Sequence, residues 1–357
     1  MQRAWLLIIL IMVVAGGHCG KKDSAPVLIA IMTKLEAGSI VGSSEINAAR
    51  MLLEDKKITN IEIIPIDDGW DPQKVLPAYR EVKQRDIRFL ITSHVSTCAM
   101  LIRDSINHDR ILTFSSGAAT DALSGSDDYI FRNMASIEIE QKSIADYLNA
   151  LPQSRILIIR DLDNFRYSEP ALHYFMAAIR KPVRLIEVSI SDFEVSELEK
   201  KMRVEDFGIL YLLVGGYKTI CGSIVQLSTL INPDVVVMMT PWMKTPTFVE
   251  SVGPAIHNVV MPSHYPPRKQ NPAIDHYLQE YKRRYAYMPT FISLNVYTAL
   301  QIMIEAIQHG HSTPETMKQY ILQKKDFDTD FMRITIDQYG DCRQPLYFIT
   351  DLEHEFE

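Results

Sequence analysis

The sequence predicts an α/β protein of two doubly wound parallel-sheet lobes, joined by a hinge with a cleft between them. From residue 26 onward, short apolar runs alternate with longer stretches of helical period, and this alternation occurs in two successive units. The chain has 357 residues, of which 47% are hydrophobic, which is enough for two cores of medium size. Strands and helices that alternate in this way form open parallel sheets with helices on both faces.

The first unit is predicted to contain four strands with three helices between them. Its apolar runs of strand length are 27–33, 61–67, 87–93 and 110–114. The helical stretches between them are 43–56, 71–85 and 97–108. The fourth strand leads into "SSGAATDALSG" (115–125), a segment dominated by small side chains, which allows its backbone to approach a neighbour or a ligand closely.

The second unit repeats this alternation and is followed by a helical region. Its expected strands are 155–161, 183–190, 207–214 and 234–240. Its expected helices are 137–151, 169–180, 195–203 and 217–230. Three more helical stretches are expected at 273–287, 293–308 and 314–325, and the tail, "MRITIDQYG" and "QPLYFITD", predicts a β-hairpin.

The chain is expected to divide into two discontinuous lobes behind an N-terminal leader. The leader comprises a signal peptide, 1–18, and a polar tether, 19–25. The N-terminal lobe is expected to comprise 26–136 plus 264–328, and the C-terminal lobe 137–263 plus 329–357. More than one crossing between the lobes is the arrangement that a hinge requires.

The first residues are typical of a secretory signal peptide. Arg3 precedes an unbroken apolar run, 4–15, which ends in two small residues and is well short of the ~20 residues that cross a bilayer. Cys19 follows this run, so acylation of Cys19 and ordinary cleavage after Gly17 are both open. We expect an exported, cell-envelope protein whose membrane contact is limited to this possible lipid anchor.

Composition and motifs argue against several other classes of function. A formal net charge of −7 does not suit a nucleic-acid partner, which needs a basic face. Cys98, Cys221 and Cys342 are isolated from one another and allow one disulfide at most, and His309 and His311 have the spacing of a loop rather than of a metal site. The sequence contains no nucleophile elbow, zinc-protease motif or nucleotide fingerprint, so we expect neither an enzyme nor a cofactor.

Several segments in order resemble the type I periplasmic solute-binding proteins, the group that includes the leucine/isoleucine/valine-binding proteins of ABC transporters. The segments are "SSEINAARML", "IDDGWDPQKVLPAYREV", "FLITSHVST", "TFSSGAATDAL", "YIFRN", "RDLDNFRYSE", "PWMKTPTFVESVG" and "YLQEYKRRYAYMPTFISLNVYTAL". The resemblance implies a monomer that captures a small molecule and hands it to a membrane permease. A sensory module that presents its ligand-bound form to a separate receptor or kinase is the alternative.

The resemblance also implies where the first lobe holds a polar head group. The matching residues are Ser96 and Thr97, at the end of the third strand, and Ala118, Ala119 and Thr120, after the fourth. Backbone amides and a hydroxyl at these positions can meet an anion. Helix capping is the alternative for the first pair, and a plain turn is the alternative for the other three residues.

In the second lobe, the resemblance implies that aromatic side chains close over the ligand. Tyr217 and Trp242 follow predicted strands, and Tyr167 and Phe165 are alternatives for one further position. Packing in the core is the other role that aromatic residues commonly have.

One position departs from the amino-acid-binding pattern. Trp242 stands where the branched-chain amino-acid binders carry a glutamate that pairs with the ligand's ammonium group. Glu138 is the candidate to replace that glutamate, and an ordinary first-turn helix glutamate is the alternative role for it. We therefore expect a small polar or amino-acid-like ligand, with an aromatic ligand favoured by the indole.

Overall fold

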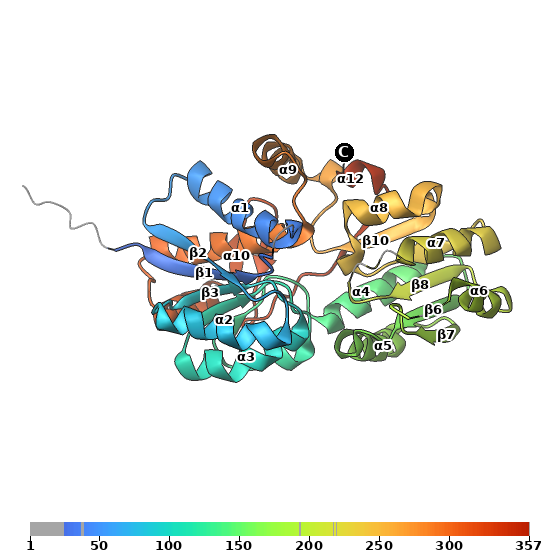
Figure 1. Ribbon diagram of the computed structural model, residues 1–357, viewed down its shortest axis with the longest axis horizontal. Helices are drawn as coiled ribbons and strands as arrows, with labels where there is room; N and C mark the ends of the chain where they lie inside the picture. Colours follow the sequence, from blue (N-terminus) through green and yellow to red (C-terminus); the bar gives the residue numbers. More distant parts are fainter. Residues whose placement is uncertain (1–24, 37–38, 193, 217, 219, 357) are drawn as a thin grey trace, which may run out of the picture.

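The computed structural model describes residues 25–356 apart from 37–38, 193, 217 and 219. Two α/β lobes lie side by side along the longest axis of the molecule, with β1 to β5 in one and β6 to β10 in the other (Figure 1). This is the predicted fold class. The expected signal peptide and Cys19 lie outside the described residues.

The first lobe contains a parallel five-stranded sheet in the order β2-β1-β3-β4-β5. Its strands are β1 (Val27–Thr33), β2 (Ile61–Asp67), β3 (Phe89–Thr92), β4 (Leu112–Ser115) and β5 (Ile130–Phe131). The central strands are continuous apolar runs because both faces of the sheet are covered by helices.

Helices cover both faces of this sheet. They are α1 (Ile40–Asp55), α2 (Pro72–Gln84), α3 (Ser96–Asp109), α9 (Pro272–Tyr285), α10 (Phe291–Gln308) and α11 (Pro314–Lys324). Helices α1, α9, α10 and α11 share one apolar core with the sheet, and α2 and α3 share the other. Helix α2 begins where expected because Asp71 accepts a hydrogen bond from the amide of Gln73 at 2.8 Å and proline occupies the first helical position.

The second lobe contains a six-stranded sheet in the order β13-β10-β9-β8-β6-β7, parallel except for β13. Its strands are β6 (Ile156–Asp161), β7 (Val183–Val188), β8 (Ile209–Leu213), β9 (Val236–Met238), β10 (Val259–Ser263) and β13 (Tyr347–Ile349). Apart from β13, its strands follow the same order as those of the first sheet, so the two halves have the same winding.

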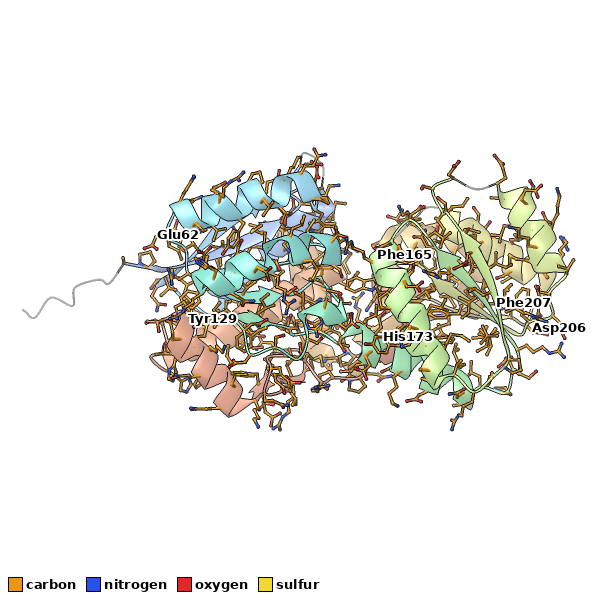
Figure 2. The ribbon with its side chains drawn as sticks, turned by 90° about the horizontal axis from the view of Figure 1, so that it is seen from below. Glu62, Tyr129, Phe165, His173, Asp206 and Phe207 are labelled. Carbon is orange, nitrogen blue, oxygen red and sulfur yellow. The ribbon has the colours of Figure 1, made fainter. Side chains whose placement is uncertain are left out.

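Helices again cover both faces. They are α4 (Ile137–Ala150), α5 (Phe165–Ala178), α6 (Val195–Arg203), α7 (Ile220–Ile231), α8 (Pro246–Val252) and α12 (Glu353–Phe356). Helices α4 and α5 pack on one face and α6, α7 and α8 on the other, and their side chains fill the interior of the lobe (Figure 2). Short 3-10 helices are η1 (Asp121–Leu123), η2 (Pro241–Met243), η3 (Gly253–Asn258) and η4 (Arg268–Gln270).

The predicted C-terminal hairpin is wrong. Strand β12 (Arg333–Thr335) pairs with β11 (Asp326–Asp328), whereas β13 pairs with β10 of the second sheet. Phe331, Ile334 and Ile336 pack in the core of the first lobe, although the predicted division assigned 329–357 to the second. The tail divides because its first part has apolar side chains that α10 and α11 cover, and its second part completes the edge of the other sheet.

The chain passes between the lobes at three places, after β5, after β10 and before β13. Two of these segments are joined at Ala135 and Cys342, which form an isolated parallel bridge. The buried Arg132 guanidinium donates to the Asp341 carboxylate at 2.9 and 2.7 Å and to the Thr120 carbonyl at 2.9 Å. This ion pair fixes the crossing segments to the small-residue loop. Three crossings make a hinge between two rigid lobes possible.

Cys98, Cys221 and Cys342 are buried and form no disulfide. Within the part of the chain that the structure describes, none of the helices has both the length and the apolar character of a bilayer span.

Candidate functional site

The strand order places a crevice in each sheet at the carboxyl ends of its strands. The order reverses direction between β1 and β3 in the first sheet and between β6 and β8 in the second. Loops that leave such a pair of strands go to opposite faces of the sheet, and ligands of open α/β proteins bind in the crevice between them. The residues just past these four strands are therefore the first candidates for a site.

A cleft of about 550 Å³ lies between the lobes and is lined by residues from both crevices. First-lobe residues on its walls are Lys34, Val41, Trp70, Ser93, Val95, Ser96, Gly117, Ala119, Thr290, Phe291 and Ile292. Second-lobe residues are Asp161, Asp163, Asn164, Tyr167, Gly215, Gly216, Lys218, Trp242 and Thr245.

The first-lobe wall consists mainly of small side chains and backbone. A Cβ atom on Gly117 would lie 1.9 Å from the carbonyl oxygen of Ser93, so only glycine allows the small-residue loop to pack against the end of β3. Helix α3 begins beside this contact, with Val95 as its N-cap and no side-chain capping hydrogen bond. Its first amides and the positive end of its dipole are available to an anionic group in the cleft.

The second-lobe wall carries large aromatic side chains. The Trp242 ring lies 6.2 Å from the ring of Tyr167 and 5.9 Å from the ring of His264. It also lies 6.0 Å from Phe291, which belongs to the first lobe, so an aromatic contact joins the two walls. These separations are typical of edge-to-face packing, and the rings together form an aromatic cluster on this wall.

Trp70 reaches the cleft through a strained turn. Its φ is 55° and that of Gly69 is 59°, and positive φ is uncommon for a bulky side chain. The turn is held by Asp68, whose carboxylate accepts a hydrogen bond from the Trp70 amide at 3.0 Å. Backbone strain of this kind gathers at functional sites, where surrounding structure holds a side chain in a required position.

Five buried polar atoms of cleft residues have no hydrogen-bond partner within the described part of the chain. They are Trp70 Nε1, Ser93 Oγ, Asp161 Oδ2, Trp242 Nε1 and Thr290 Oγ1. Buried polar groups are nearly always hydrogen-bonded in folded proteins, so an unsatisfied cluster needs a partner from outside the chain. Trp242 Nε1 lies beside the Glu140 carboxyl and the Tyr167 hydroxyl, behind the wall. One indole donor, two hydroxyls and one carboxylate oxygen are thus available to a ligand that has both acceptors and a donor.

Charged groups of both signs lie on the cleft. Lys34 and Lys218 bring cations from opposite lobes, and Lys218 forms no ion pair with any residue that the structure describes. Burial raises the pKa of Asp161, and the Lys218 charge opposes this rise. The Asp161 Oδ1 atom accepts the Asp163 amide at 2.9 Å, which leaves Oδ2 for a ligand.

A second acid lies behind the aromatic wall. Glu140 is fully buried on α4 and accepts hydrogen bonds from the Tyr167 hydroxyl and, at 3.0 Å, from the Gln141 amide. Burial raises the pKa of Glu140 to about 7, against the effect of these donors. This acid holds Tyr167 in its orientation without contacting the cleft itself.

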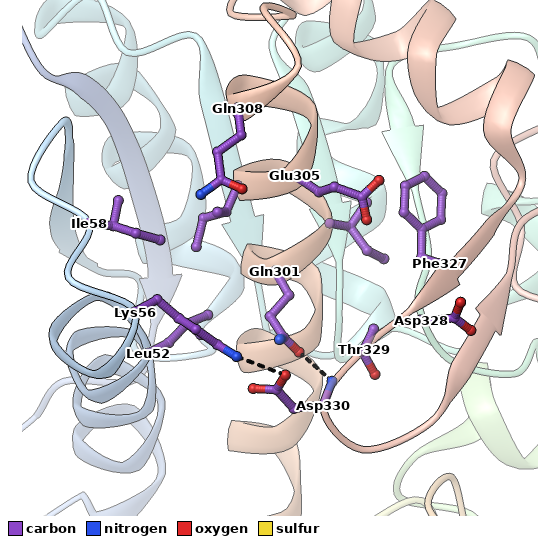
Figure 3. A pocket seen from close by; sticks show the side chains of 12 residues that line it. Leu52, Lys56, Ile58, Gln301, Glu305, Gln308, Phe327, Asp328, Thr329 and Asp330 are labelled. Carbon is purple, nitrogen blue, oxygen red and sulfur yellow. Dashed lines mark hydrogen bonds and ion pairs between the residues drawn. The ribbon is translucent and has the colours of Figure 1, made fainter.

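Another hollow, of about 260 Å³, lies on the first lobe between α1, α10 and β11 (Figure 3). Its polar groups already pair with one another: Lys56 with Asp330 at 3.0 Å, and the Gln301 side chain with the Asp330 amide at 3.1 Å. Because its groups are satisfied and partly exposed, it is a weaker candidate than the cleft.

The family comparison can now be added to this geometry. A family model described as periplasmic binding protein matches residues 30–350. The chain belongs to the periplasmic binding protein family. The resemblance predicted from the sequence is thereby confirmed, as is the two-lobe fold that it implied. No curated protein matches the chain.

Solved periplasmic binding proteins share the fold at low identity. A leucine-binding protein from Thermotoga maritima has a TM-score of 0.78 at 17% identity, covering 90% of this chain and 94% of its own. A branched-chain amino acid transporter substrate-binding protein from Streptococcus pneumoniae, in complex with isoleucine, has 0.78 at 16%, covering 91% and 95%. A solute-binding protein of an ABC transporter from Rhodopseudomonas palustris, in complex with p-hydroxybenzoic acid, has 0.79 at 14%, covering 90% and 92%.

Four of the residues predicted for the site line the cleft: Ser96, Ala119, Tyr167 and Trp242. The structure therefore brings together residues from α3, the small-residue loop, α5 and η2, which are far apart in the sequence. Tyr217 lies outside the described residues, and its contact with a ligand stays a prediction.

Three other predicted first-lobe residues do not line the cleft. Ala118 is buried in the core shared with α2 and α3. Thr97 lies in the first turn of α3, one residue beyond Ser96 and ~100° further round the helix, and it is not among the residues that line the cleft. Thr120 caps η1 through its side chain, which accepts the Ala122 amide at 3.3 Å. The turn interpretation therefore describes Thr120 better than ligand contact does.

Two predicted second-lobe residues also lie elsewhere. Glu138 is exposed on the outer side of α4 beside Lys142 and Tyr174, so it cannot pair with a ligand in the cleft. Phe165, labelled at the beginning of α5 in Figure 2, is 57% exposed and lies under the Arg160 guanidinium. Of the two alternatives for this position, Tyr167 is the one on the cleft.

Sequence reasoning missed several cleft residues, notably Lys34, Trp70, Ser93, Asp161 and Lys218. Each lies at the end of a predicted strand or within a few residues after it, which was the available signal. Thr290 and Phe291 had no such signal, because they open α10 and reach the cleft only through the packing of the first lobe.

His309 and His311 stack on Tyr320, with ring centroids 5.4 and 4.7 Å apart, at the end of α10. Among the residues that the structure describes, no three His, Cys, Asp or Glu side chains are grouped so that they could hold a metal ion.

Proposed function

We propose that this protein captures a small aromatic carboxylate that also carries a hydroxyl or another hydrogen-bond donor, closes its lobes around it and delivers it to the permease of an ABC transporter. The observation that carries the proposal is the set of unpartnered polar atoms on the cleft, contributed by Trp70, Ser93, Asp161 and Thr290 and framed by the rings of Trp242, Tyr167 and Phe291. A cleft of about 550 Å³ with apolar walls and few convergent polar groups suits a single-ring ligand.

The distribution of donors and acceptors supports one orientation of the ligand. A carboxylate at the first lobe would meet the Ser93 hydroxyl and the amides at the start of α3, where the helix dipole favours negative charge. A hydroxyl at the other end of the ring would donate to Asp161 Oδ2. The ring would then pack against Trp242 and Tyr167.

The ligands of structural neighbours span both chemical classes that the sequence left open. The Rhodopseudomonas palustris neighbour was solved with p-hydroxybenzoic acid and the Streptococcus pneumoniae neighbour with isoleucine. Two indole rings and an edge-to-face aromatic cluster favour the aromatic acid here.

The proposal also includes export of the protein from the cytoplasm and closure of its two lobes around the ligand. The apolar N-terminal run supports a signal peptide, and Cys19 supports a lipid anchor that would hold the mature protein at the membrane beside its permease. The three crossings between the lobes support hinge closure, driven by the ligand's contacts with both walls in the closed form.

Titration calorimetry of the mature protein with 4-hydroxybenzoate, benzoate and leucine tests the proposal. We expect 4-hydroxybenzoate to bind about tenfold more tightly than benzoate, because its hydroxyl satisfies Asp161, and we expect Asp161→Asn to reduce this difference. Tight binding of leucine with no binding of either aromatic acid would overturn the assigned ligand class. Small-angle scattering should show compaction with 4-hydroxybenzoate, and an unchanged radius at saturation would contradict closure.

A further inference from the structure

A carboxylic acid is buried directly beneath the first-lobe wall of the cleft. Glu45, in the second turn of α1, has no exposed surface, and neither of its carboxyl oxygens has a hydrogen-bond partner among the described residues. Val41 lines the cleft and precedes Glu45 by four residues, so both lie on the same face of the helix, one turn apart. An unpaired buried carboxylate is costly, so this acid needs an explanation.

The Ser93 hydroxyl links this acid to the cleft. The carboxyl group of Glu45 lies beside the hydroxyls of Ser93 and Thr33. Both hydroxyl oxygens are buried and, like the carboxyl, lack a partner of ordinary hydrogen-bond length within the described residues. Ser93 is also one of the residues that line the cleft, whereas Glu45 and Thr33 are not. A ligand that contacts Ser93 is therefore one side chain away from Glu45.

The surroundings favour the neutral form of Glu45. Burial raises the pKa of Glu45 to about 8; the hydroxyls of Ser93 and Thr33 oppose the rise, and the charge of Asp68 adds to it. Asp68 itself is bound to His94, with 2.6 Å between Oδ2 and Nδ1. The Nδ1 atom of that histidine is therefore engaged by another carboxylate, and its Nε2 atom is buried without a partner among the described residues.

No nearby element offers Glu45 a free positive charge. Lys34, next along the chain from Thr33, lies 3.9 Å from Glu36, and its side chain is 41% exposed. Helix α10, which packs along α1, has no acidic or basic side chain before Glu305, and Tyr297 is its only other titratable residue in that stretch. The described groups around Glu45 thus leave it to be neutralised by a proton.

We propose that Glu45 is a positioning residue that makes the first-lobe wall selective for anions: as a neutral acid it donates its proton to Ser93 Oγ and so directs the Ser93 hydroxyl hydrogen into the cleft. A hydroxyl has one hydrogen to donate and two lone pairs to accept with, so it can accept from Glu45 and donate to a ligand at the same time. Such a chain strengthens both hydrogen bonds. The inference rests on the proposed function, in which a carboxylate meets this wall.

An ionised Glu45 would have the opposite effect. It would accept a hydrogen bond from Ser93, which turns the hydroxyl hydrogen away from the cleft, and it would add a negative charge beneath a bound anion. Binding of an anion and ionisation of Glu45 therefore oppose each other. Uncharged ligands of the same shape are not subject to this coupling.

Calorimetric titrations with benzoate and benzamide between about pH 6 and pH 9 test this coupling. The two compounds have similar shapes, and the benzoate carboxylate stays ionised throughout. We expect the benzoate affinity of the wild type to fall towards tenfold for each pH unit above the ionisation of Glu45. Glu45→Gln, which keeps a donor and cannot ionise, should bind benzoate nearly as well at pH 6 and show no such fall. Benzamide affinity should not change with pH in either protein.

A second variant separates positioning from folding. Glu45→Leu removes the donor and the charge together at similar volume, so its benzoate affinity should be several-fold lower than that of Glu45→Gln at every pH and should not vary with pH. A purely structural role would instead leave the pH profile of benzoate binding in both variants as in the wild type. The proposal would be overturned if both variants kept the wild-type pH profile of benzoate binding, or if the benzoate affinity of the wild type did not change with pH.

An infrared difference spectrum between the wild type and Glu45→Gln separates this inference from the proposed function. We expect the carbonyl band of a protonated acid at neutral pH, and a carboxylate band would overturn the inference even if benzoate binds well. If benzoate and 4-hydroxybenzoate do not bind, the proposed function fails and anion selection fails with it, while the spectrum still decides the protonation state.

Discussion

The two walls of the cleft differ in the size of their side chains and in the acid that lies behind each. The first-lobe wall presents Gly117, Ala119 and hydroxyls, with Glu45 beneath it and without a hydrogen-bond partner in the described chain. The second-lobe wall presents Trp242 and Tyr167, with Glu140 behind them and held by two donors. The difference indicates that the two walls bind different parts of the ligand. Small residues let donors reach a head group, and large rings hold the body of the ligand.

The largest expected effect concerns the acid behind the first wall. Because the pKa of Glu45 is raised by burial to about 8, the folded protein binds a proton that the unfolded chain loses near pH 4.5. The wild type should therefore lose stability as pH rises from about 4.5 to 8, and Glu45→Gln should lack this part of the loss. At ~1.4 kcal/mol per pKa unit, the variant should gain about 4 to 5 kcal/mol relative to the wild type over this range.

Urea unfolding of the two proteins at several pH values checks this prediction, and the difference should level off above about pH 8. Parallel stability curves would show that Glu45 is ionised in the folded state. The claim that a neutral acid lies behind the first-lobe wall would then be wrong.

The acid behind the second wall should show the same effect to a smaller extent. Burial raises the pKa of Glu140 to about 7, so the gain of Glu140→Gln should build up between about pH 4.5 and 7. Its size should be about 3 kcal/mol, since the amide oxygen still accepts from the Tyr167 hydroxyl. The same urea titrations measure it. A gain equal to that of Glu45→Gln, or one that continues to pH 8, would contradict the contrast between the two acids.

Removing the main aromatic side chain should weaken binding without unfolding the protein. Trp242→Ala should reduce the affinity for 4-hydroxybenzoate by about 2 to 3 kcal/mol, because the ring packs on the ligand's body and lies partly exposed at the cleft. Calorimetry and melting curves together check this, with Trp242→Phe as the control that keeps a ring. A large drop in melting temperature with unchanged affinity would assign Trp242 to the core instead.

The smallest expected effect concerns two hydroxyls on the first wall. Ser93→Ala should weaken binding of 4-hydroxybenzoate by about 1 to 2 kcal/mol, as expected for one hydrogen bond to a charged acceptor. Thr97→Val is the matched control, since Thr97 does not line the cleft, and calorimetry should find its affinity unchanged. The opposite ranking would mean that the sequence-based choice of Thr97 was right and that the cleft geometry misassigns the head-group site.

Sequence patterns were sufficient to predict the strands and helices that residues adjacent in sequence determine. The predicted strands 27–33 and 61–67 coincide with β1 and β2. Most of β1 is buried as a continuous apolar run, and β2 keeps alternate apolar residues buried at the edge of the sheet. The helix predicted at 169–180 begins earlier in the structure, at Phe165, and contains Pro170. On one helix, residues two apart point in nearly opposite directions, and this separates Tyr167 from Phe165.

The remaining site residues depend on contacts distant in sequence. The burial of Glu45 results from the packing of α10 along α1, and nothing in "SSEINAARML" marks that glutamate as different from a surface residue. Trp70 reaches the cleft only because its backbone adopts a positive φ that its residue type does not favour. The separation of the tail between two sheets likewise depends on which edge each strand meets.

The most direct test of the division between the walls is the ratio of benzoate affinity to benzamide affinity, measured by calorimetry at neutral pH in the wild type, Ser93→Ala and Trp242→Ala. If the first wall recognises the anion and the second recognises the ring, Ser93→Ala should lower the ratio, and Trp242→Ala should weaken both ligands equally and leave the ratio unchanged. A ratio that is unaffected by Ser93→Ala, or that changes with Trp242→Ala, would contradict the account.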